Sequence, residues 1–259
     1  MPDLGQDLTG CAGLVERGDP ARFRAAMAAP VAARRVLFPV YAFNVEVSRA
    51  PWMTQEPIIA EMRLQWWRDA LDEIGAGGPV RRHEVVTPLA DVLDAKGAGL
   101  LDALIAARQW DIYRDPFEDD AHLTSYLEKT SGNLMLAAAR ALGQADEAVV
   151  MDAGYAAGVA NWLCAIPALE EAGRVPLLDG RPDAIRALAK GGLARLAAAR
   201  KARSGVSAAA RPALLAAWQA EGVLRRAAAH PGLVAQGVLA PSPIRSALGL
   251  AARSITGRW

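Results

Sequence analysis

Carboxylates at helical spacing are the first residues in this sequence that could do chemistry. Asp69 and Glu73 are four residues apart, and so are Asp111 and Asp115. Two side chains at this spacing share one face of an α-helix, where their oxygens could hold a divalent cation. Asp69 and Glu73, however, sit beside Asp72 on a face opposite much of an apolar stripe, which favours a solvated helix surface.

The second pair adjoins a turn rich in acidic residues, Asp115-Pro-Phe-Glu-Asp-Asp120. In such a turn Asp119 or Asp120 is expected to cap the following helix, because an aspartate oxygen accepts from the free backbone amides of the first helical turn. A structural role is therefore favoured for these carboxylates as well.

Thiols and imidazoles offer no further metal site. The chain has two cysteines, Cys11 and Cys164, which are far apart, and its three histidines (His83, His122 and His230) are isolated from one another. Neither set has the spacing of metal ligands. We expect reduced thiols in a cytoplasm, with Cys164 buried in packing. These residue types predict no metal and no cofactor.

The elements that must position any site are helical. Alanine and leucine dominate, no strand-like alternation persists, and turn signals separate segments of helical length. Asp19-Pro20 opens a short helix, and a loop is expected at 173–182. We find no internal repeat or long linker and predict a single all-α domain over residues 1–259. Longer helices are expected at about 31–50, 56–74, 84–94, 99–113, 119–142, 145–169, 184–201, 207–230 and 243–255.

The charge is distributed unevenly along the chain. The net charge is +1, but residues 184–259 hold 12 Lys/Arg against one acid, Glu221. A basic region of this kind suggests an anionic partner, such as a membrane surface or an acidic protein, although Arg and Ala at tolerant surface positions would give the same pattern. We predict no nucleic-acid partner, because Trp218 is the one aromatic residue of this region before Trp259 and stacking platforms are lacking.

Membrane insertion and secretion are not expected. No run of about 18 apolar residues is free of charge, and the N-terminal sequence MPDLGQDLTG carries acids where a signal peptide has bases. These features predict a cytoplasmic protein, which could still lie peripherally on the inner membrane.

Three stretches together resemble the squalene/phytoene synthase family. They are Arg35-Val-Leu-Phe-Pro-Val-Tyr-Ala-Phe43, then the helix from Tyr126 to Gly143, and Gly158-Val-Ala-Asn161 running to Gly173-Arg174. Their order and spacing cover about residues 20–180. The resemblance implies an isoprenoid synthase-like helical bundle around a central cavity, in which aspartates on two facing helices hold Mg²⁺ and a prenyl diphosphate.

This sequence departs from both aspartate motifs. The resemblance places the first aspartates near positions 48, 49 and 52, and the sequence has Ser48, Arg49 and Trp52 there. It places the second pair near 165 and 169, which are Ala165 and Leu169. Pro51 and Pro167 interrupt the two motifs, and Cys164 stands where an arginine is usual, while Asn161 keeps its expected position. No catalytic residue and no metal ligand is therefore assigned.

One divergent branch of the family matches better. Tyr41-Ala-Phe-Asn-Val-Glu46 and the stretch from Ile59 to Leu71 resemble a mitochondrial complex I assembly factor and its α-proteobacterial relatives, which also lack the paired aspartates. The resemblance implies an assembly or scaffold factor, a pseudoenzyme with a protein partner and with room for a lipid or isoprenoid ligand. The alternatives are an active Mg²⁺-dependent prenyl transferase of the squalene/phytoene synthase type and a terpenoid-binding carrier.

The resemblance also nominates residues of the inherited cavity as ligand contacts. They are Tyr41, Phe43, Asn44, Glu46, Trp67, Tyr126, Asn133, Asn161 and Arg174. For Glu46 two roles are open: a ligand contact, or an internal ion pair with Arg35, Arg68 or Arg174, since a buried carboxylate needs a partner.

Two further apolar features have two interpretations each. One stripe of the helix at 56–74 comprises Ile58, Met62, Trp66, Ala70 and Ile74. Trp66 is therefore expected in the core, while Trp67 could line the cavity or an interface. The C-terminal segment places Ile244, Leu248, Ala251, Ile255 and Trp259 on one face, and this basic amphipathic helix could lie on an anionic membrane or pack on its own domain.

Overall fold

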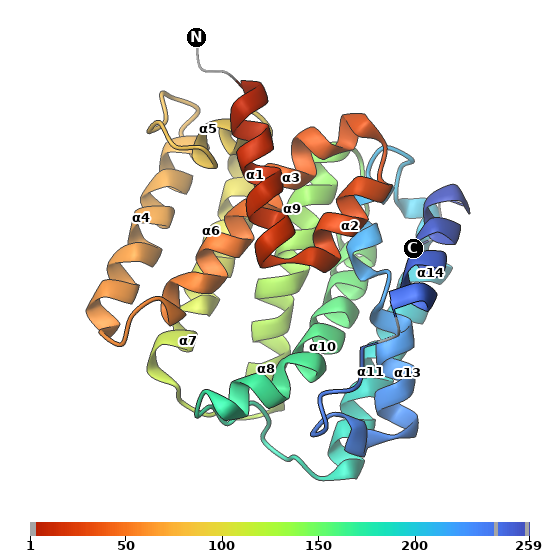
Figure 1. Ribbon diagram of the computed structural model, residues 1–259. Helices are drawn as coiled ribbons and strands as arrows, with labels where there is room; N and C mark the ends of the chain where they lie inside the picture. Colours follow the sequence, from red (N-terminus) through yellow and green to blue (C-terminus); the bar gives the residue numbers. More distant parts are fainter. Residues whose placement is uncertain (1–3, 241–242, 257–258) are drawn as a thin grey trace.

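The protein is a bundle of helices in a computed structural model that describes residues 4–240, 243–256 and 259. No β-strand occurs among these residues, and the helices run side by side around α10 (Figure 1). The longer helices are α1 (Leu4–Gly18), α2 (Pro20–Ala28), α3 (Val31–Arg49), α4 (Pro57–Gly75), α6 (Ala95–Arg108), α9 (Asn133–Leu142), α10 (Glu147–Glu171), α11 (Pro182–Lys201), α13 (Ala220–Ala229) and α14 (Pro243–Thr256). The shorter helices are α5 (Val86–Ala90), α7 (Trp110–Tyr113), α8 (Asp120–Leu127) and α12 (Arg211–Leu214), and a π-helical turn (Glu128–Gly132) joins α8 to α9.

Helix α10 is the centre of the bundle. It packs against α9, α11 and α13, and one continuous apolar core extends from Cys11 in α1 to Trp259. By length and composition α10 could cross a membrane, but 72% of its apolar window is buried inside the fold. Burial against neighbouring helices therefore accounts for its apolar character.

The predicted all-α, single-domain architecture is confirmed, and most expected helices are present. Asp19 and Asp119 cap α2 and α8 by accepting from the backbone amides of Arg22 and His122, as expected. The sequence predicted no helix at α1, which contains several glycines. Tertiary packing stabilises α1 despite its low helix propensity, because Cys11 and Val15 are fully buried and α1 lies along α3.

The expected apolar stripe of α4 is only half correct. Ala70 and Ile74 are buried, but Ile58 and Met62 are 59% and 66% exposed. Trp66 is half-buried, so its assignment to the core was wrong. Its neighbour Trp67 is buried instead, because α4 turns this ring towards α3.

The two cysteines differ in their surroundings. Cys11 is fully buried, and burial raises the pKa of its thiol to about 12. Cys164 is exposed, contrary to the expectation that it packs in the interior. It lies on an outward face of α10, between the buried residues Leu163 and Ile166.

One arginine of the basic region pairs with acidic residues of the preceding part of the chain. Arg195 of α11 bonds both Asp152 of α10 and Glu128 of the π-helical turn, at 2.6 Å each. Within the basic region itself, Glu221 accepts a hydrogen bond from Arg200 at 2.7 Å, and this bond holds the pKa of Glu221 below its ordinary value. The basic residues of α11 and α13 thus serve internal pairs as well as the surface.

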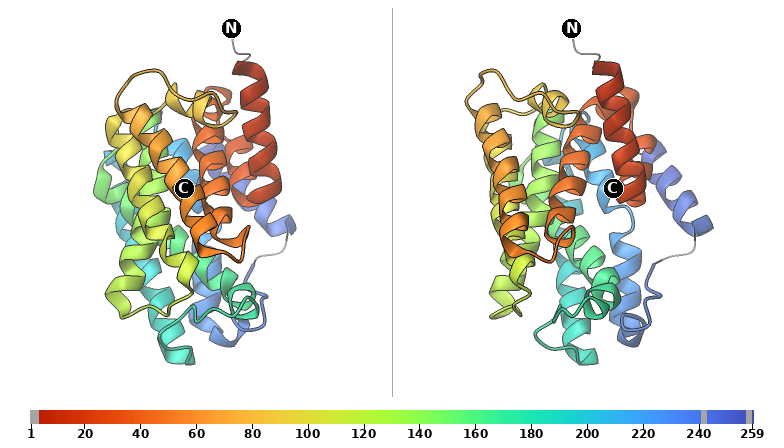
Figure 2. Two further views of the ribbon diagram at one scale, coloured as in Figure 1. Left: turned by 90° about the vertical axis from the view of Figure 1, so that its left-hand side faces the viewer. Right: turned by 60° about the vertical axis from the view of Figure 1, so that its left-hand side comes forward.

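Helix α14 packs on the domain at the edge of the bundle, as both views in Figure 2 show. Ser254 donates to the carbonyl of Ala28 at 2.6 Å, and Leu250 and Trp259 are buried. The face expected to be apolar was wrong at Leu248, which is 68% exposed, and at Ala251, which is also exposed. The side chains of Ile244 and Ile255 lie outside the described residues.

Candidate functional site

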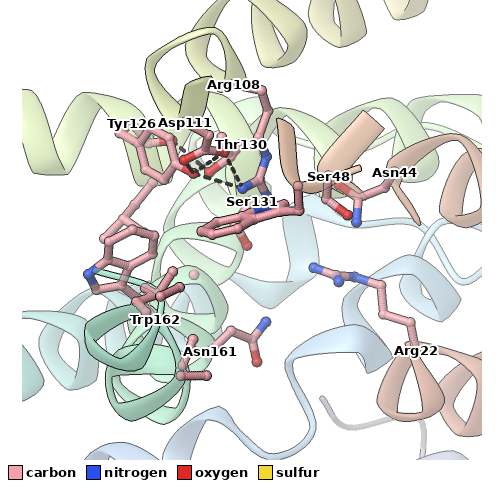
Figure 3. A pocket seen from close by; sticks show the side chains of 17 residues that line it. Arg22, Asn44, Ser48, Arg108, Asp111, Tyr126, Thr130, Ser131, Asn161 and Trp162 are labelled. Atoms are coloured by element: carbon pink, nitrogen blue, oxygen red, sulfur yellow. Dashed lines mark hydrogen bonds and ion pairs between the residues drawn. The ribbon is translucent and has the colours of Figure 1, made fainter. Parts of the chain in front are cut away.

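A cavity of about 430 Å³ lies between α3, α8, the π-helical turn and α10 (Figure 3). This volume is within the range of roughly 300–1,000 Å³ typical of small-molecule sites. The positions at which the resemblance places metal-binding aspartates all reach it apart from Arg49: Ser48 and Trp52 line one wall, and Ala165 and Leu169 line the other. The sequence therefore located the two facing walls correctly, and they carry no carboxylate.

Among the described residues that line the cavity, Asp111 of α7 is the single carboxylate. It is buried, and both of its oxygens accept from the hydroxyl of Tyr126 at 3.0 Å. The guanidinium of Arg108 donates to Asp111 at 3.1 Å and to the Tyr126 hydroxyl at 2.7 Å. Asp111 is thus already satisfied by two neighbours.

Burial and pairing both act on the ionisation of this cluster. Burial raises the pKa of the Tyr126 phenol, so the hydroxyl stays protonated and continues to donate. Burial opposes the charged form of Arg108, but Tyr126 and Asp111 outweigh it and raise its pKa. The cluster is therefore a fixed ion pair with a bridging phenol, and it holds one wall of the cavity rigid.

The other end of the cavity is polar. Asn44 of α3 is 6% exposed, and its amide is not among the buried side-chain atoms that lack a hydrogen-bond partner, so it is open to the cavity. Arg22 of α2 and Asn161 of α10 approach the same space, and Figure 3 shows their side chains directed towards Asn44 and Ser48. The Arg22 guanidinium is anchored on its far side by an ion pair with Asp19.

Close contact between helices shapes the floor of the cavity. Ser131 of the π-helical turn donates to the carbonyl of Gly154 in α10 at 2.8 Å. A Cβ on Gly154 would lie 2.7 Å from the Cα of Gly132, so only glycine allows this approach. The wider π turn thereby directs Thr130 and Ser131 at the cavity.

Arg174 lies beside the cavity and behind Trp52. Its guanidinium stacks over the rings of Trp52 and Trp110, at 4.8 and 5.7 Å from their centroids. The side chain is 7% exposed, and its Nε and Nη1 have no hydrogen-bond partner among the described residues. Burial lowers its pKa, in part offset by the charge of Asp111.

Three other nominated residues lie in the core and do not line the cavity. Tyr41 is buried and donates to the carbonyl of Ala213 at 3.5 Å. Phe43 is fully buried and packs edge-on against Trp67, with 5.4 Å between ring centroids. Asn133 donates to the carbonyl of Leu100 at 3.2 Å. Tyr41 lies on the same face of α3 as Asn44 but one turn before it, with the guanidinium of Arg22 over its ring at 5.9 Å. Phe43 and Asn133 are directed at other neighbours in the core.

Glu46 and Trp67 line a second hollow, which we call the α4 groove. It measures about 640 Å³ and is lined by Glu46, Arg49, Ala50, Met53, Ile59, Met62, Arg63, Trp66, Trp67 and His83. The ion pair considered for Glu46 does not form with any described residue: Arg68 pairs with Asp102, Arg174 stacks on Trp52, and Arg35 is exposed. Glu46 points to the opposite side of α3 from Asn44, so it cannot reach the cavity.

Arg22, Arg108, Asp111 and Trp162 are cavity residues that sequence reasoning missed. The four-residue spacing of Asp111 and Asp115 marked Asp111 as a candidate ligand. The acidic turn that follows it favoured a structural role instead. The sequence offered one usable signal, since Arg108 and Asp111 are three residues apart and form an ion pair. Nothing local distinguishes Arg22 from the other arginines of α2 and α3.

Comparisons with known proteins agree with this geometry. The family described as squalene/phytoene synthase matches residues 15–177. A Drosophila melanogaster protein named NADH dehydrogenase (ubiquinone) complex I, assembly factor 6 homolog is 32% identical over 170 residues, which cover 61% of this chain and 50% of that protein. The Bos taurus protein named assembly factor 6 of the same complex is 26% identical over 173 residues, covering 61% and 48%. The chain spans about half the length of the curated relatives it matches.

Solved structures of similar fold cover nearly the whole chain. A dehydrosqualene synthase in complex with ligand has a TM-score of 0.79 at 14% identity, covering 98% of this chain and 97% of the other. The squalene synthase HpnC from Alicyclobacillus acidocaldarius has a TM-score of 0.68 at 19% identity, covering 92% and 96%. These likenesses show the fold, and the match over residues 15–177 shows more: the chain belongs to the squalene/phytoene synthase family.

Proposed function

We propose that this protein is a non-enzymatic member of its family and acts as an assembly or scaffold factor for a respiratory complex of the complex I type. One observation carries the proposal: Ser48, Trp52, Ala165 and Leu169 occupy the cavity positions at which the family's metal-binding aspartates are expected. The names of the matched relatives support the assembly role.

The donor set of the cavity does not fit a Mg²⁺–diphosphate complex. Mg²⁺ takes hard oxygen ligands, usually one or two carboxylates with water and phosphate oxygens. The cavity offers Asp111 alone, which is engaged by Arg108 and Tyr126. No group of three or more His, Cys, Asp or Glu side chains with metal-site geometry occurs among the residues that the structure describes.

The α4 groove supports a partner outside the cavity. Met53, Ile58, Ile59 and Met62 are 41–66% exposed, so an apolar surface runs along the first half of α4. Contiguous exposed apolar side chains are typical of surfaces that contact another protein or a membrane. We place the protein in the cytoplasm, peripherally on the inner membrane, where such a complex is assembled.

Two measurements test the proposal. With Mg²⁺ and farnesyl or geranylgeranyl diphosphate, the purified protein should release no diphosphate above a no-protein blank, while an authentic synthase run in parallel does. Deletion of the gene in its own host should reduce the amount of assembled complex I on native gels, and the wild-type gene should restore it. Diphosphate release well above the blank, which Asp111→Asn abolishes while the variant stays folded by circular dichroism, would instead establish the alternative, a prenyl transferase with a rebuilt metal site.

A further inference from the structure

The α4 groove leaves one face of α4 without a packing partner inside the fold. Helix α4 packs mainly on α6 and lies at the edge of the bundle (Figure 1). Its groove face consists of Ile59, Met62, Arg63 and Trp66, and Ile59 and Met62 are 41% and 66% exposed. Met53, just before the helix, adds a further exposed apolar side chain at 54%. Positions i, i+3, i+4 and i+7 form the seam by which one helix packs against another.

The groove is a recess between two helices and not a flat patch. One wall is the end of α3 with Ala50, the other wall is α4, and the lining includes Trp67, which is only 5% exposed. From Ile59 to Trp66 the seam extends about 10 Å along the helix axis, or about two turns. A second helix laid between α3 and α4 fits this recess, whereas a planar bilayer surface contacts only its rim.

The charged residues of the groove define what such a helix carries. Arg49 on the α3 wall and Arg63 on the α4 wall are exposed, and neither makes an ion pair or hydrogen bond with a described residue. Two arginines on opposite walls favour a helix with acidic side chains on both flanks of its apolar seam.

Glu46 narrows the choice of partner further. It lies one turn before Arg49 on the α3 wall and is likewise unpaired among the described residues. The arginines of the groove therefore exceed its carboxylates by one. An anionic lipid surface would place its head groups against Glu46 at close range, which is unfavourable. A protein helix can instead present a neutral or basic residue at that single point.

We infer that the α4 groove binds one amphipathic α-helix of another protein, whose aliphatic seam lies on Ile59, Met62 and Trp66 and whose acidic flanks pair with Arg49 and Arg63. The inference rests on the proposed assembly function, because it names the kind of partner segment through which that function is exerted.

Calorimetric titration of the full chain with synthetic peptides tests the chemistry of the partner. The probe is a peptide of about 18 residues, long enough to form a helix, with Leu along one seam, Glu on both flanks and Ala elsewhere. One matched peptide has Lys in place of each Glu, and another has the same composition with the Leu residues moved out of the seam. We expect the acidic peptide to bind at least tenfold more tightly than either, and its advantage over the Lys peptide to shrink at high salt. Equal affinity for either matched peptide, or no binding of the acidic peptide, overturns the inference.

Two variants connect the binding with the groove. Met62→Asp should weaken binding of the acidic peptide by tenfold or more, whereas Leu248→Asp, at a side chain of similar exposure (68%) on α14, should not. Arg63→Glu should lower the preference for the acidic over the Lys peptide at least tenfold, with the exposed Arg203→Glu as its matched control. Circular dichroism checks that all four variants are folded. Unchanged binding in both groove variants contradicts the inference.

Two other occupants of the groove would give different results. If a second copy of the chain fills it, the wild-type protein alone is a dimer by light scattering and Met62→Asp makes it a monomer. If a membrane covers it, the wild type sediments with phosphatidylcholine–phosphatidylglycerol vesicles, Met62→Asp does not, and the peptides are not distinguished. Either result overturns the inference.

Complementation of the gene deletion separates this inference from the proposed function. If the wild-type gene restores complex I assembly and Met62→Asp restores it equally well, only the inference about the groove fails. If the acidic peptide binds selectively but the deletion leaves complex I unchanged, only the assembly role fails.

Discussion

The cavity and the α4 groove lie on opposite faces of α3 and depart from ordinary burial in opposite directions. Asn44 and Ser48 face the cavity, where polar groups line an interior space and Asn44 is more than nine-tenths buried. Glu46 and Arg49 face the groove, where Met62 and Ile59 are exposed at the surface. The first hollow thus brings polar groups inside the fold, and the second leaves apolar groups outside it.

The two hollows also differ in how firmly their walls are held in place. The cavity has a rigid wall, because Asp111, Tyr126 and Arg108 are bonded to one another. In the α4 groove Trp66, Trp67 and His83 stack edge to face, but the opposite side consists of flexible Met and Arg side chains. A fixed, polar-ended cavity suits one small ligand, whereas a flexible apolar groove adapts to a larger partner.

The largest effect is expected at the rigid wall of the cavity. Asp111→Asn removes the charge that compensates Arg108 in a buried position and should lower the free energy of unfolding by about 3–5 kcal/mol. Denaturant unfolding measures this loss. A loss below about 1 kcal/mol would mean that water reaches Arg108 and that the wall is less rigid than its contacts indicate.

A pair of substitutions on α4 contrasts the core with the groove. Leu64 is fully buried and Met62, two residues earlier, is 66% exposed. Leu64→Ala should cost about 2–5 kcal/mol of stability, and Met62→Ala should change it by less than about 0.5 kcal/mol. A large cost at Met62, measured under the same conditions, would mean that the groove is closed by the protein itself.

Two buried asparagines allow a structural amide to be compared with one that faces the cavity. Asn133→Leu removes the donor to the Leu100 carbonyl and should cost about 1–3 kcal/mol, because that carbonyl loses its partner. Asn44→Leu removes no hydrogen bond to a described residue and should leave the stability of the fold unchanged or increase it. Thermal unfolding of both variants measures the difference. Similar losses of stability at both positions would mean that the amide of Asn44, like that of Asn133, has a structural role.

The smallest effect concerns the edge of the groove and depends on pH. Hydrogen bonds from Arg81 hold the pKa of Glu73 below its ordinary value, and Arg81 in turn stacks on Trp66 at 4.9 Å. Because the folded pKa is lowered, this contribution is present above the unfolded pKa and disappears as pH falls through the folded value. The difference in melting temperature between wild type and Glu73→Gln should therefore be constant near neutrality and vanish in acid. A difference that persists in acid would assign the effect to something other than this ion pair.

The sequence by itself determined the fold class, most helices and the family. Alanine-rich helical segments separated by Gly and Pro turns are local properties, and caps such as Asp119 depend on neighbours within a few residues. The sequence also supplied the positions at which the family resemblance places aspartates, since these follow from counting along the chain from the matched motifs. The sequence did not predict the exposed thiol of Cys164 or the helix α1, because composition does not say which face of a helix packs against a neighbouring helix.

Only the tertiary structure decided which polar groups share one space. Arg22, Asn44 and Asn161 are separated by up to 139 positions and meet because α2, α3 and α10 pack together. It also placed Asn133 against a backbone carbonyl, Tyr41 and Phe43 in the core, and Glu46 in the groove. The physical reason is that a side chain's partners are fixed by the rotation of each helix against its neighbours, and a residue's own helix period leaves that rotation open.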